Sequence, residues 1–324
     1  MKRFVLMIIT ALICGMVFTS CSDKISDEAR NYLNEVLDIM EKNSINRYEI
    51  NWADFRKKVF KTVPEAQTID DTYPGIKKAL TLLGDHHSFF MRPNGSRFWG
   101  SYSGTGTYQK EEIWTPAIPN DVGYVTVSTH NLQFPNEALS KAFANEIQNQ
   151  IKRQDHLRLK GWIVDLRNNG GGNMYPMLAG IGPILGEGVA GYFITPDRRE
   201  ISWGFQNGNA VYNNDPLKLL SDSYKLLVSN PKVAVLLNFA IASSGEAIAV
   251  SFIGRENTKS FGSATYGLTT GNQGFRLSDN AILYLTTVYF ADRNKKTYGG
   301  GPINPDVISS SATIINDALA WIRE

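Results

Sequence analysis

Residues 233–253 read VAVLLNFAIASSGEAIAVSFI. The first part, 233–239, is an apolar run rich in valine and leucine, which is typical of a strand buried on both faces. The second part, 240–253, has apolar residues at helical spacing, so the pattern predicts a helix directly after the strand. A buried strand that leads into a helix is the repeating unit of an α/β fold.

The same arrangement occurs earlier in the chain. GWIVDLR at 161–167 is a second candidate for a buried strand, and the loop NNGGGN and a predicted helix at 174–185 follow it. GYVTVST at 123–129 predicts another strand, and 136–153 predicts a helix. Strands and helices that alternate in this way predict an α/β core.

The chain before this core is predicted to be helical. Ser26 is an N-cap candidate, and the acidic side chains that follow it suit the positive end of a helix. Further helices are expected over 52–63 and from Pro74, a favoured first residue, to a stop at Gly84.

The domain boundaries follow from these patterns. Residues 90–120 are rich in glycine, serine, proline and aromatic residues, which predicts loops and short strands. We therefore expect an N-terminal helical subdomain over 21–90, a connecting segment over 91–121 and the α/β core over 122–324.

Residues 1–20, MKRFVLMIITALICGMVFTS, have the features of an export signal. Lys2 and Arg3 form a basic start, and the apolar run after them is shorter than the roughly 20 residues that span a membrane. Small residues before Cys21 resemble a bacterial lipobox, in which the cysteine becomes the lipid-modified N-terminus. The pattern predicts a lipoprotein of the cell envelope, anchored at the outer membrane or on the periplasmic face. The alternatives are an ordinary signal peptide cleaved nearby and a Cys21 of no special role.

The composition excludes several classes of protein. The chain has 324 residues, of which 43% are hydrophobic and 20% charged, and these values indicate a globular protein rather than a disordered one. Without residues 1–20 the chain keeps 31 basic and 31 acidic side chains, which argues against nucleic-acid binding through phosphates. Cys14 would be removed with the signal and Cys21 would carry the lipid, so the folded part would contain no free thiol. No CxxC pair is present and there are only four histidines, so we expect no metal and no cofactor.

Two glycine- and serine-rich junctions could take part in chemistry. Ser243 and Ser244 follow the 233–239 strand, where a hydroxyl would face the positive end of a helix and the next backbone N–H could hold an oxyanion. The simpler interpretation is that either serine is only the N-cap of that helix. The glycine triplet 170–172 follows the 161–167 strand and lets the backbone approach another group closely. It would supply a second oxyanion donor, or it forms only a tight turn.

Two further loops carry polar residues of interest. DHHS at 85–88 comes after the helix stop, and histidine is the usual general base for a serine nucleophile because its pKa lies near neutrality. A lone histidine in a loop is more often only a polar surface residue. GGGPINPDV at 299–307 by itself indicates a loop before a strand or a helix.

Taken together, these segments resemble peptidase family S41 in order and spacing. That family includes the C-terminal-processing (tail-specific) peptidases and the tricorn core protease. DLRNNGGG at 165–172, IASSGE at 241–246, GSATYG at 262–267 and PINPD at 302–306 are similar to its DLRxNxGG, TASASE-like, GxxTYG and GIxPD segments, and DHHS at 85–88 is similar to its DxH[ST] segment. The resemblance implies a ββα-spiral (crotonase/Clp-like) α/β core with a small N-terminal helical subdomain.

The resemblance also implies an activity and a set of site residues. The protein would be a serine endopeptidase that hydrolyses peptides or unfolded proteins in the cell envelope. The nucleophile would be Ser243 and the general base His87. The oxyanion donors would be Ser244 with Gly171 or Gly172, and the substrate-binding residues would be Thr265, Tyr266 and Gly267.

Two departures from the family pattern bear on the mechanism. The C-terminal-processing branch uses a lysine directly after TYG, and here that position is Leu268, which cannot accept a proton. That branch also has a PDZ domain before the core, and the stretch 89–122 is too short for one. Both departures point to the tricorn-like branch, which uses a serine, a histidine and an acid. The acid's position is occupied by Gly299, so three candidates remain open, Asp306, Asp292 and Asp85.

Two other classes of function remain open at this stage. A catalytically silent protein of this fold would bind peptides or hydrophobic ligands, and the missing lysine and the unplaced acid keep this alternative in view. An envelope structural or assembly protein would neither cleave nor bind peptides.

Overall fold

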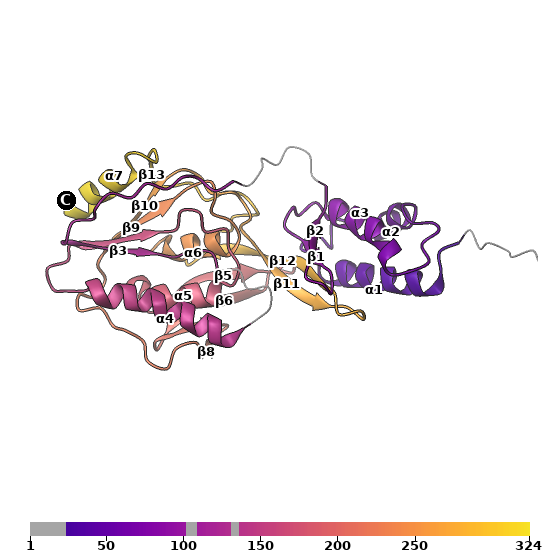
Figure 1. Ribbon diagram of the computed structural model, residues 1–324, viewed down its shortest axis with the longest axis horizontal. Helices are drawn as coiled ribbons and strands as arrows, with labels where there is room; N and C mark the ends of the chain where they lie inside the picture. The colour runs from indigo at the N-terminus through magenta and orange to yellow at the C-terminus, as the bar shows by residue number, and fades with distance from the viewer. Residues whose placement is uncertain (1–23, 102–108, 131–135) are drawn as a thin grey trace, which may run out of the picture.

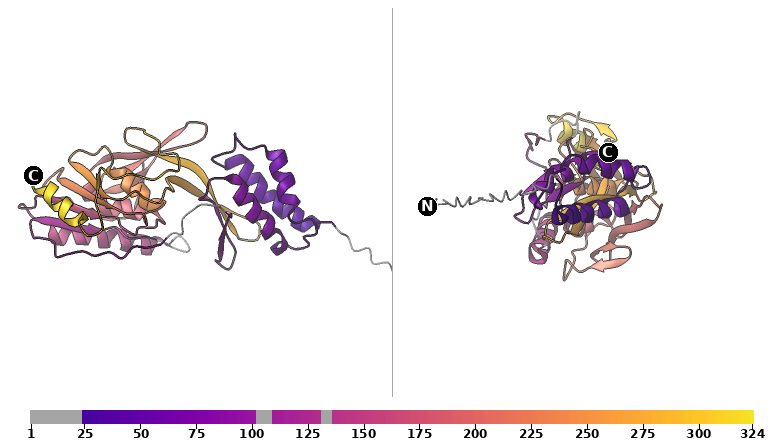
Figure 2. Two further views of the ribbon diagram at one scale, coloured as in Figure 1. Left: turned by 90° about the horizontal axis from the view of Figure 1, so that it is seen from above. Right: turned by 90° about the vertical axis from the view of Figure 1, so that its right-hand side faces the viewer.

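The computed structural model describes residues 24–101, 109–130 and 136–324. The predicted signal and Cys21 lie outside the described residues. The chain forms two parts that lie next to each other along the long axis, a smaller one built mainly from the N-terminal helices and a larger α/β core (Figures 1 and 2). None of the helices in the described ranges is long and apolar enough to cross a membrane.

Three helices form most of the N-terminal part. They are α1 (Asp27–Asn43), α2 (Trp52–Phe60) and α3 (Tyr73–Leu83), with a short 3-10 turn, η1 (Asp70–Thr72), before α3. The Ser26 hydroxyl caps α1 by accepting from the Ala29 N–H at 3.1 Å, as predicted. Helix α3 ends at Gly84, whose φ of 70° lies in the left-handed region that glycine tolerates best. Apolar side chains of the three helices form a buried cluster of their own.

A long hairpin of the core completes the N-terminal part. It consists of β11 (Thr270–Arg276) and β12 (Ile282–Asp292), and its tip buries Leu277, Ala281, Leu283 and Leu285 in the helical cluster. The short strands β1 (Phe89–Met91) and β2 (Arg97–Trp99) extend the sheet from β12. β2 thus packs with the N-terminal helices through Phe98, and the tip of the hairpin reaches the same helices from the core.

The core contains a five-stranded parallel sheet in the order β13-β10-β9-β4-β3. Its strands are β3 (Val122–Thr126), β4 (Gly161–Asp165), β9 (Lys232–Leu237), β10 (Thr258–Gly262) and β13 (Val307–Ile308). Helices α4 (Glu137–Gln154), α5 (Met174–Leu185) and α6 (Ser244–Phe252) bury one face, and α7 (Ile314–Arg323) buries the other. The α/β core with a small N-terminal helical region is thus confirmed.

A second, antiparallel sheet packs on the other side of α5 and α6. It contains β5 (Gly188–Ile194), β6 (Glu200–Gln206), β7 (Asn209–Tyr212) and β8 (Asp215–Leu217), and it runs in the order β2-β1-β12-β5-β6-β7-β8 with β11 paired to β12. The sequence patterns did not predict β5 to β8. Strand β12 is shared, because one end pairs with β1 and the other with β5.

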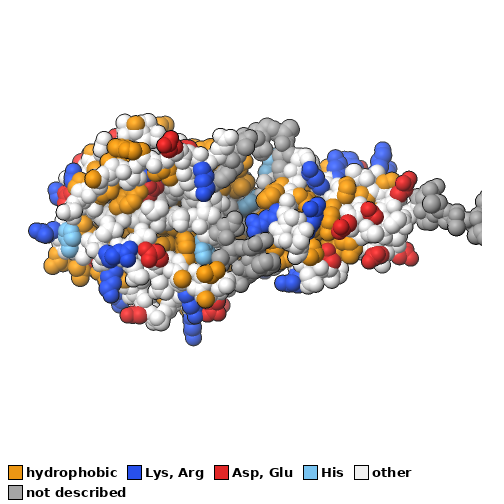
Figure 3. All heavy atoms as spheres, in the orientation of Figure 1, with side chains coloured by type: hydrophobic (Ala, Val, Ile, Leu, Met, Phe, Trp, Pro, Cys, Tyr) orange, Lys and Arg blue, Asp and Glu red, His pale blue; other side chains and the backbone are white. Residues whose placement is uncertain are grey.

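Basic and acidic side chains are mixed over both parts on the face shown in Figure 3. This agrees with the nearly equal numbers of the two kinds in the sequence.

Candidate active site

Ser243 lies on the sharp turn where β9 is followed by α6, as the sequence predicted. Its backbone has φ 54° and ψ −121°, a region that a residue other than glycine rarely adopts. Strain of this kind persists only where surrounding contacts enforce it, and it is concentrated at functional sites. The turn presents the partly exposed Ser243 to a cleft, ahead of the first turn of α6.

The buried carboxylate of Glu246 holds this turn in place. It accepts hydrogen bonds from the N–H groups of Ser243, Gly267 and Leu268, at 2.7–2.9 Å, and from the Thr265 hydroxyl. Burial raises the pKa of Glu246 to about 7, while the four donors act in the opposite direction. Glu246 therefore ties the Ser243 turn to the 265–268 segment, a role that the sequence did not reveal although Glu246 stands in the quoted motif.

The glycine triplet packs directly against the Ser243 turn, so the predicted close approach is confirmed. Gly171 has φ 97°, and a Cβ added there would come within 2.9 Å of the Ser243 Cβ and 3.0 Å of the Ser244 nitrogen. The Ser244 hydroxyl donates to the Gly172 carbonyl at 2.6 Å. Only glycine fits at 171, because both the backbone angle and the space exclude a side chain.

The structure changes one of the expected oxyanion donors. The Gly171 N–H donates to the Asn169 side chain at 3.0 Å, so it is already occupied and Gly171 is withdrawn as a donor. Gly172 and Ser244 line the cleft. Within the described ranges, neither of their N–H groups has an acceptor in the protein. These two groups remain candidates to hold an oxyanion.

His87 sits in a loop that is fixed by its own Asp85 and by strand β11. The Asp85 carboxylate accepts from the backbone N–H of His87 at 2.9 Å, which shapes the turn after α3. The ring Nδ1 lies 2.7 Å from the Thr270 hydroxyl, and the Asn272 amide donates to the His87 carbonyl at 3.0 Å. Burial lowers the pKa of His87 to about 4, so its ring is neutral at pH 7, the form that a general base needs.

None of the three acids left open by the sequence contacts the His87 ring within the described residues. Asp306 accepts from the backbone and hydroxyl of Ser260, and Asp292 accepts from the Tyr298 hydroxyl. Asp85 accepts from the backbone N–H of His87 and from the backbone and hydroxyl of Ser88, but it does not contact the ring. The ring is held instead by Thr270, which sequence reasoning missed, since a threonine at the start of a strand carries no signal of its own.

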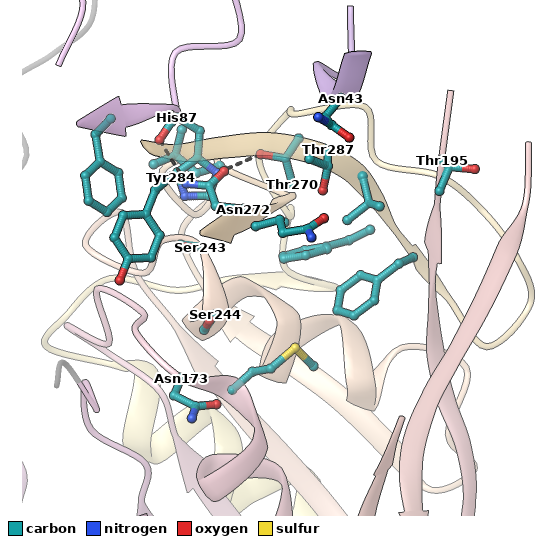
Figure 4. A pocket seen from close by; sticks show the side chains of 18 of the residues that line it. Asn43, His87, Asn173, Thr195, Ser243, Ser244, Thr270, Asn272, Tyr284 and Thr287 are labelled. Carbon is teal, nitrogen blue, oxygen red and sulfur yellow. Dashed lines mark hydrogen bonds between the residues drawn. The ribbon is translucent and has the colours of Figure 1, made fainter. Parts of the chain in front are cut away.

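Ser243 and His87 line the same cleft, whose volume is about 980 Å³ (Figure 4). His87 comes from the N-terminal part and Ser243 from the core, so the cleft is built from both. In the described part of the chain, no hydrogen bond joins the Ser243 hydroxyl to the His87 ring. Catalytic hydrogen bonds are often looser before substrate binds, so the arrangement is compatible with a serine–histidine pair.

The three residues expected to bind substrate are not found along the cleft. Thr265 is almost fully buried and, like Gly267, bonds to Glu246. The Tyr266 ring packs on Phe239, with 5.3 Å between ring centroids. In the ranges that the structure describes, this segment therefore supports the Ser243 turn, and its neighbour Leu268 is the residue that reaches the cleft.

Aromatic side chains form one wall of the cleft. Trp99, Phe89 and Tyr284 lie in register across β2, β1 and β12. The rings of Phe89 and Tyr284 stack with their centroids 4.6 Å apart, and Trp99 lies 5.3 Å from Phe89. Such a wall suits apolar substrate side chains. Among the described residues, no group of three or more His, Cys, Asp or Glu side chains is arranged to hold a metal ion.

Comparison with known proteins agrees with this arrangement. Residues 121–309 match the sequence profile of peptidase family S41. The nisin-resistance protein of Lactococcus lactis subsp. lactis is 26% identical over 296 residues, which cover 91% of this chain and 87% of that protein.

Two solved structures are similar over nearly the whole chain. A lipoprotein from Streptococcus agalactiae superposes with a TM-score of 0.73 at 24% identity, over 92% of this chain and 97% of that one. A photosystem II D1 C-terminal processing protease superposes with a TM-score of 0.58 at 16% identity, over 92% and 97% of the two chains. At these identities the two structures show a shared fold.

Proposed function

Because the chain belongs to peptidase family S41, we propose that it is a serine endopeptidase with Ser243 as the nucleophile and His87 as the general base. One observation carries the proposal. A strained serine turn, two backbone N–H groups without acceptors in the described residues and a neutral histidine line one cleft. These are the parts that acyl transfer requires.

The proposed reaction begins with the orientation of His87. Its Nδ1–H donates to the Thr270 hydroxyl, which leaves the lone pair of Nε2 as the proton acceptor. Nε2 takes the Ser243 proton while Oγ forms a bond to the peptide carbonyl carbon. The N–H groups of Ser244 and Gly172 hold the oxyanion, and each such donor contributes about 2.7–4 kcal/mol in comparable sites.

The second half of the reaction returns the enzyme to its starting state. His87 gives the proton to the leaving amine as the C–N bond breaks. A water molecule then attacks the acyl ester, His87 takes the water proton, and Ser243 receives it back when the acid leaves.

Ser243 and His87 must form a hydrogen bond for this reaction, and none joins their side chains in the described residues. A β-bulge between Gly271 and Asn272 interrupts the β11–β12 ladder directly beside Thr270. Bulges are common next to active sites and bend the strand that contains them. We propose that a bound peptide draws the His87 loop toward Ser243 by a small movement of this hairpin.

We further propose that the protein works in the cell envelope, where Cys21 would anchor it to a bacterial membrane. The lipobox-like sequence supports this location, and the lipoprotein and the nisin-resistance protein among the similar proteins are consistent with it. The substrates would be peptides or unfolded proteins, and nisin belongs in the first panel because of that relative.

The proposal is tested with a fluorophosphonate probe and a peptide library. We expect labelling and turnover in the wild type, and the loss of both in Ser243→Ala and His87→Ala. Ser221→Ala removes an exposed serine outside the cleft and should behave as the wild type. If Ser243→Ala is still labelled or still cleaves peptides at the wild-type rate, the nucleophile is wrong.

A catalytically silent binding protein is the second candidate. The absence of a direct Ser243–His87 hydrogen bond in the described residues, and of a carboxylate on the ring, favours it. Peptide binding without labelling between pH 6 and pH 9 would establish this alternative.

A further inference from the structure

Four basic side chains line the cleft and come from both parts of the molecule. They are Lys42 at the end of α1, Arg47 in the loop after it, Arg97 on β2 and Arg199 in the turn between β5 and β6. No aspartate or glutamate is found among the described residues that line this cleft. The cleft is therefore positive although the chain as a whole is nearly neutral.

One carboxylate neutralises part of this charge. Asp197 accepts from Arg47 Nη2 and from Arg199 Nε, both at 2.9 Å, so one carboxylate forms ion pairs with two arginines. Lys42 and Arg97 have no ion-pair partner in the described parts of the chain. Two cations at the cleft are thus available to a ligand.

The positions of these side chains suit a bound peptide. The Arg97 guanidinium lies 5.7 Å from the Phe89 ring centroid, beside the aromatic wall. The basic side chains reach the cleft from α1 and the loop after it, from β2 and from the turn between β5 and β6, so positive charge is contributed by both parts of the molecule. Clefts lined by one sign of charge concentrate ligands of the opposite sign.

We propose that this cleft selects peptides that carry a carboxylate, either on an acidic side chain or at the C-terminus. The inference rests on the proposed function, because it assigns a substrate class to the same cleft. A carboxylate would pair with Lys42 or Arg97, whereas a lysine or arginine of the substrate would face like charge.

The experiment compares matched peptides. A peptide that the wild type cleaves is made with Glu, Gln or Lys at each position in turn, and each version is made with a free and with an amidated C-terminus. At low salt we expect kcat/KM to favour one carboxylate-bearing form by about 5-fold, the effect of one charge pair of roughly 1 kcal/mol. Glu over Gln assigns the preference to a side chain, and free over amidated assigns it to the C-terminus. The ratio should fall as salt is added.

Variants of the basic residues test whether the preference for a carboxylate arises in the cleft. In the double variant Lys42→Gln/Arg97→Gln the ratio should fall to about one. The matched control Lys77→Gln removes an exposed lysine of α3 that does not line the cleft, and it should keep the wild-type ratio. A ratio near one in the wild type, a preference for Lys, or an unchanged ratio in the double variant overturns the inference while peptidase activity stands.

A binding assay separates this inference from the proposed function. If no peptide is cleaved, the proposed function fails, and fluorescent forms of the Glu and Gln peptides, each free or amidated, are titrated against Ser243→Ala. Tighter binding of a carboxylate-bearing form supports the inference without catalysis. Equal binding of all forms, or no binding, overturns it.

Discussion

The His87 ring is oriented by a hydroxyl, since Thr270 occupies the position at Nδ1 that a carboxylate holds in a serine–histidine–acid triad. A hydroxyl can fix the tautomer of the ring, but it stabilises the imidazolium less than a negative charge would. We therefore expect slower acyl transfer than an acid-supported triad would give. A slow step of this kind would be a property of the site, separate from how well substrate binds.

Replacement of Thr270 tests this role. Thr270→Val keeps the shape of the side chain but leaves Nδ1–H unpaired, and we expect kcat to fall by about 10- to 100-fold with little change in KM, because a wrongly oriented ring costs up to about 10⁴-fold in a triad. Thr270→Ser keeps the hydroxyl and should stay within about 3-fold of the wild type. Equal losses in both variants, seen in kcat, would contradict an orienting role.

The low pKa of His87 predicts how stability depends on pH. Its folded pKa is about 4 and its ordinary value is 6.5, so the unfolded chain binds a proton in this range that the folded chain does not. The contribution of His87 to stability is complete above pH 6.5 and is lost as the pH falls toward 4. Between pH 6.5 and 4.5 the wild type should lose about 2 kcal/mol more than His87→Asn.

Urea unfolding at the two pH values measures this difference directly. Other groups that titrate in the same range affect the wild type and the variant alike, so the comparison isolates His87. The same losses in both proteins would show that the ring is solvated in solution.

At the scale of elements, the contact between the glycine loop and the Ser243 turn is the tightest feature of the site. Gly171→Ala would press a Cβ against Ala242 O, Ser243 Cβ and Ser244 N, all within 3.0 Å. We expect this variant to lose most of its activity and about 1–3 kcal/mol of stability. Gly186→Ala is the matched control, because Gly186 has a similar φ of 88° but nothing within 4 Å of the added Cβ.

The two glycine variants are compared by thermal unfolding and by kcat/KM. Both should lose stability through the backbone strain, but only Gly171→Ala should lose activity beyond what its stability explains. An active Gly171→Ala would mean that the loop does not shape the oxyanion site.

The sequence could predict some of the strands and helices and not others. The strands at 161–167 and 233–239 and the helix at 174–185 are defined by local apolar runs and local spacing, and the structure has each within about two residues. Strands β5 and β6 were missed because glycine interrupts their alternation, and β7 and β8 are only four and three residues long. The strand that joins them to the rest of their sheet, β12, pairs with β5 and lies far away in the sequence.

The residues of the candidate site also fall into those that the sequence could predict and those that it could not. Motifs of a few residues brought out Ser243 and His87, and the structure places both at the cleft. The partnership of His87 and Thr270 spans 183 positions and depends on the hairpin, so no local pattern could reveal it. The choice between Gly171 and Gly172 as the second donor depends on the direction of one peptide N–H, which residue type does not determine.

At the scale of the whole molecule, β12 is the strand that connects the part carrying His87 with the core that carries Ser243. Its first residues pair with β1, two positions after His87, and its last residues pair with β5 in the core. Leu283 is fully buried among the N-terminal helices. The position of His87 relative to Ser243 therefore depends on how firmly the hairpin tip is held.

Leu283→Ala tests this dependence. We expect it to lose about 2–5 kcal/mol of stability, as is usual for a buried leucine, and to lower kcat even at temperatures where the protein stays folded. Leu319→Ala removes a buried leucine of α7 on the far face of the parallel sheet and is the control. If both variants lose activity in proportion to stability alone, as judged by thermal unfolding and kcat, the hairpin does not position the base.

Because of the shared hairpin, we expect the two parts to associate even when the peptide connection between them is cut. The N-terminal helices bury their apolar side chains on residues 277–285, which belong to the other end of the chain. Two separate polypeptides, one that ends near residue 101 and one that begins near residue 109, would thus recognise each other through the buried interface between the N-terminal helices and the hairpin tip. The protein would then serve as a split reporter, with fragment complementation read out as restored hydrolysis.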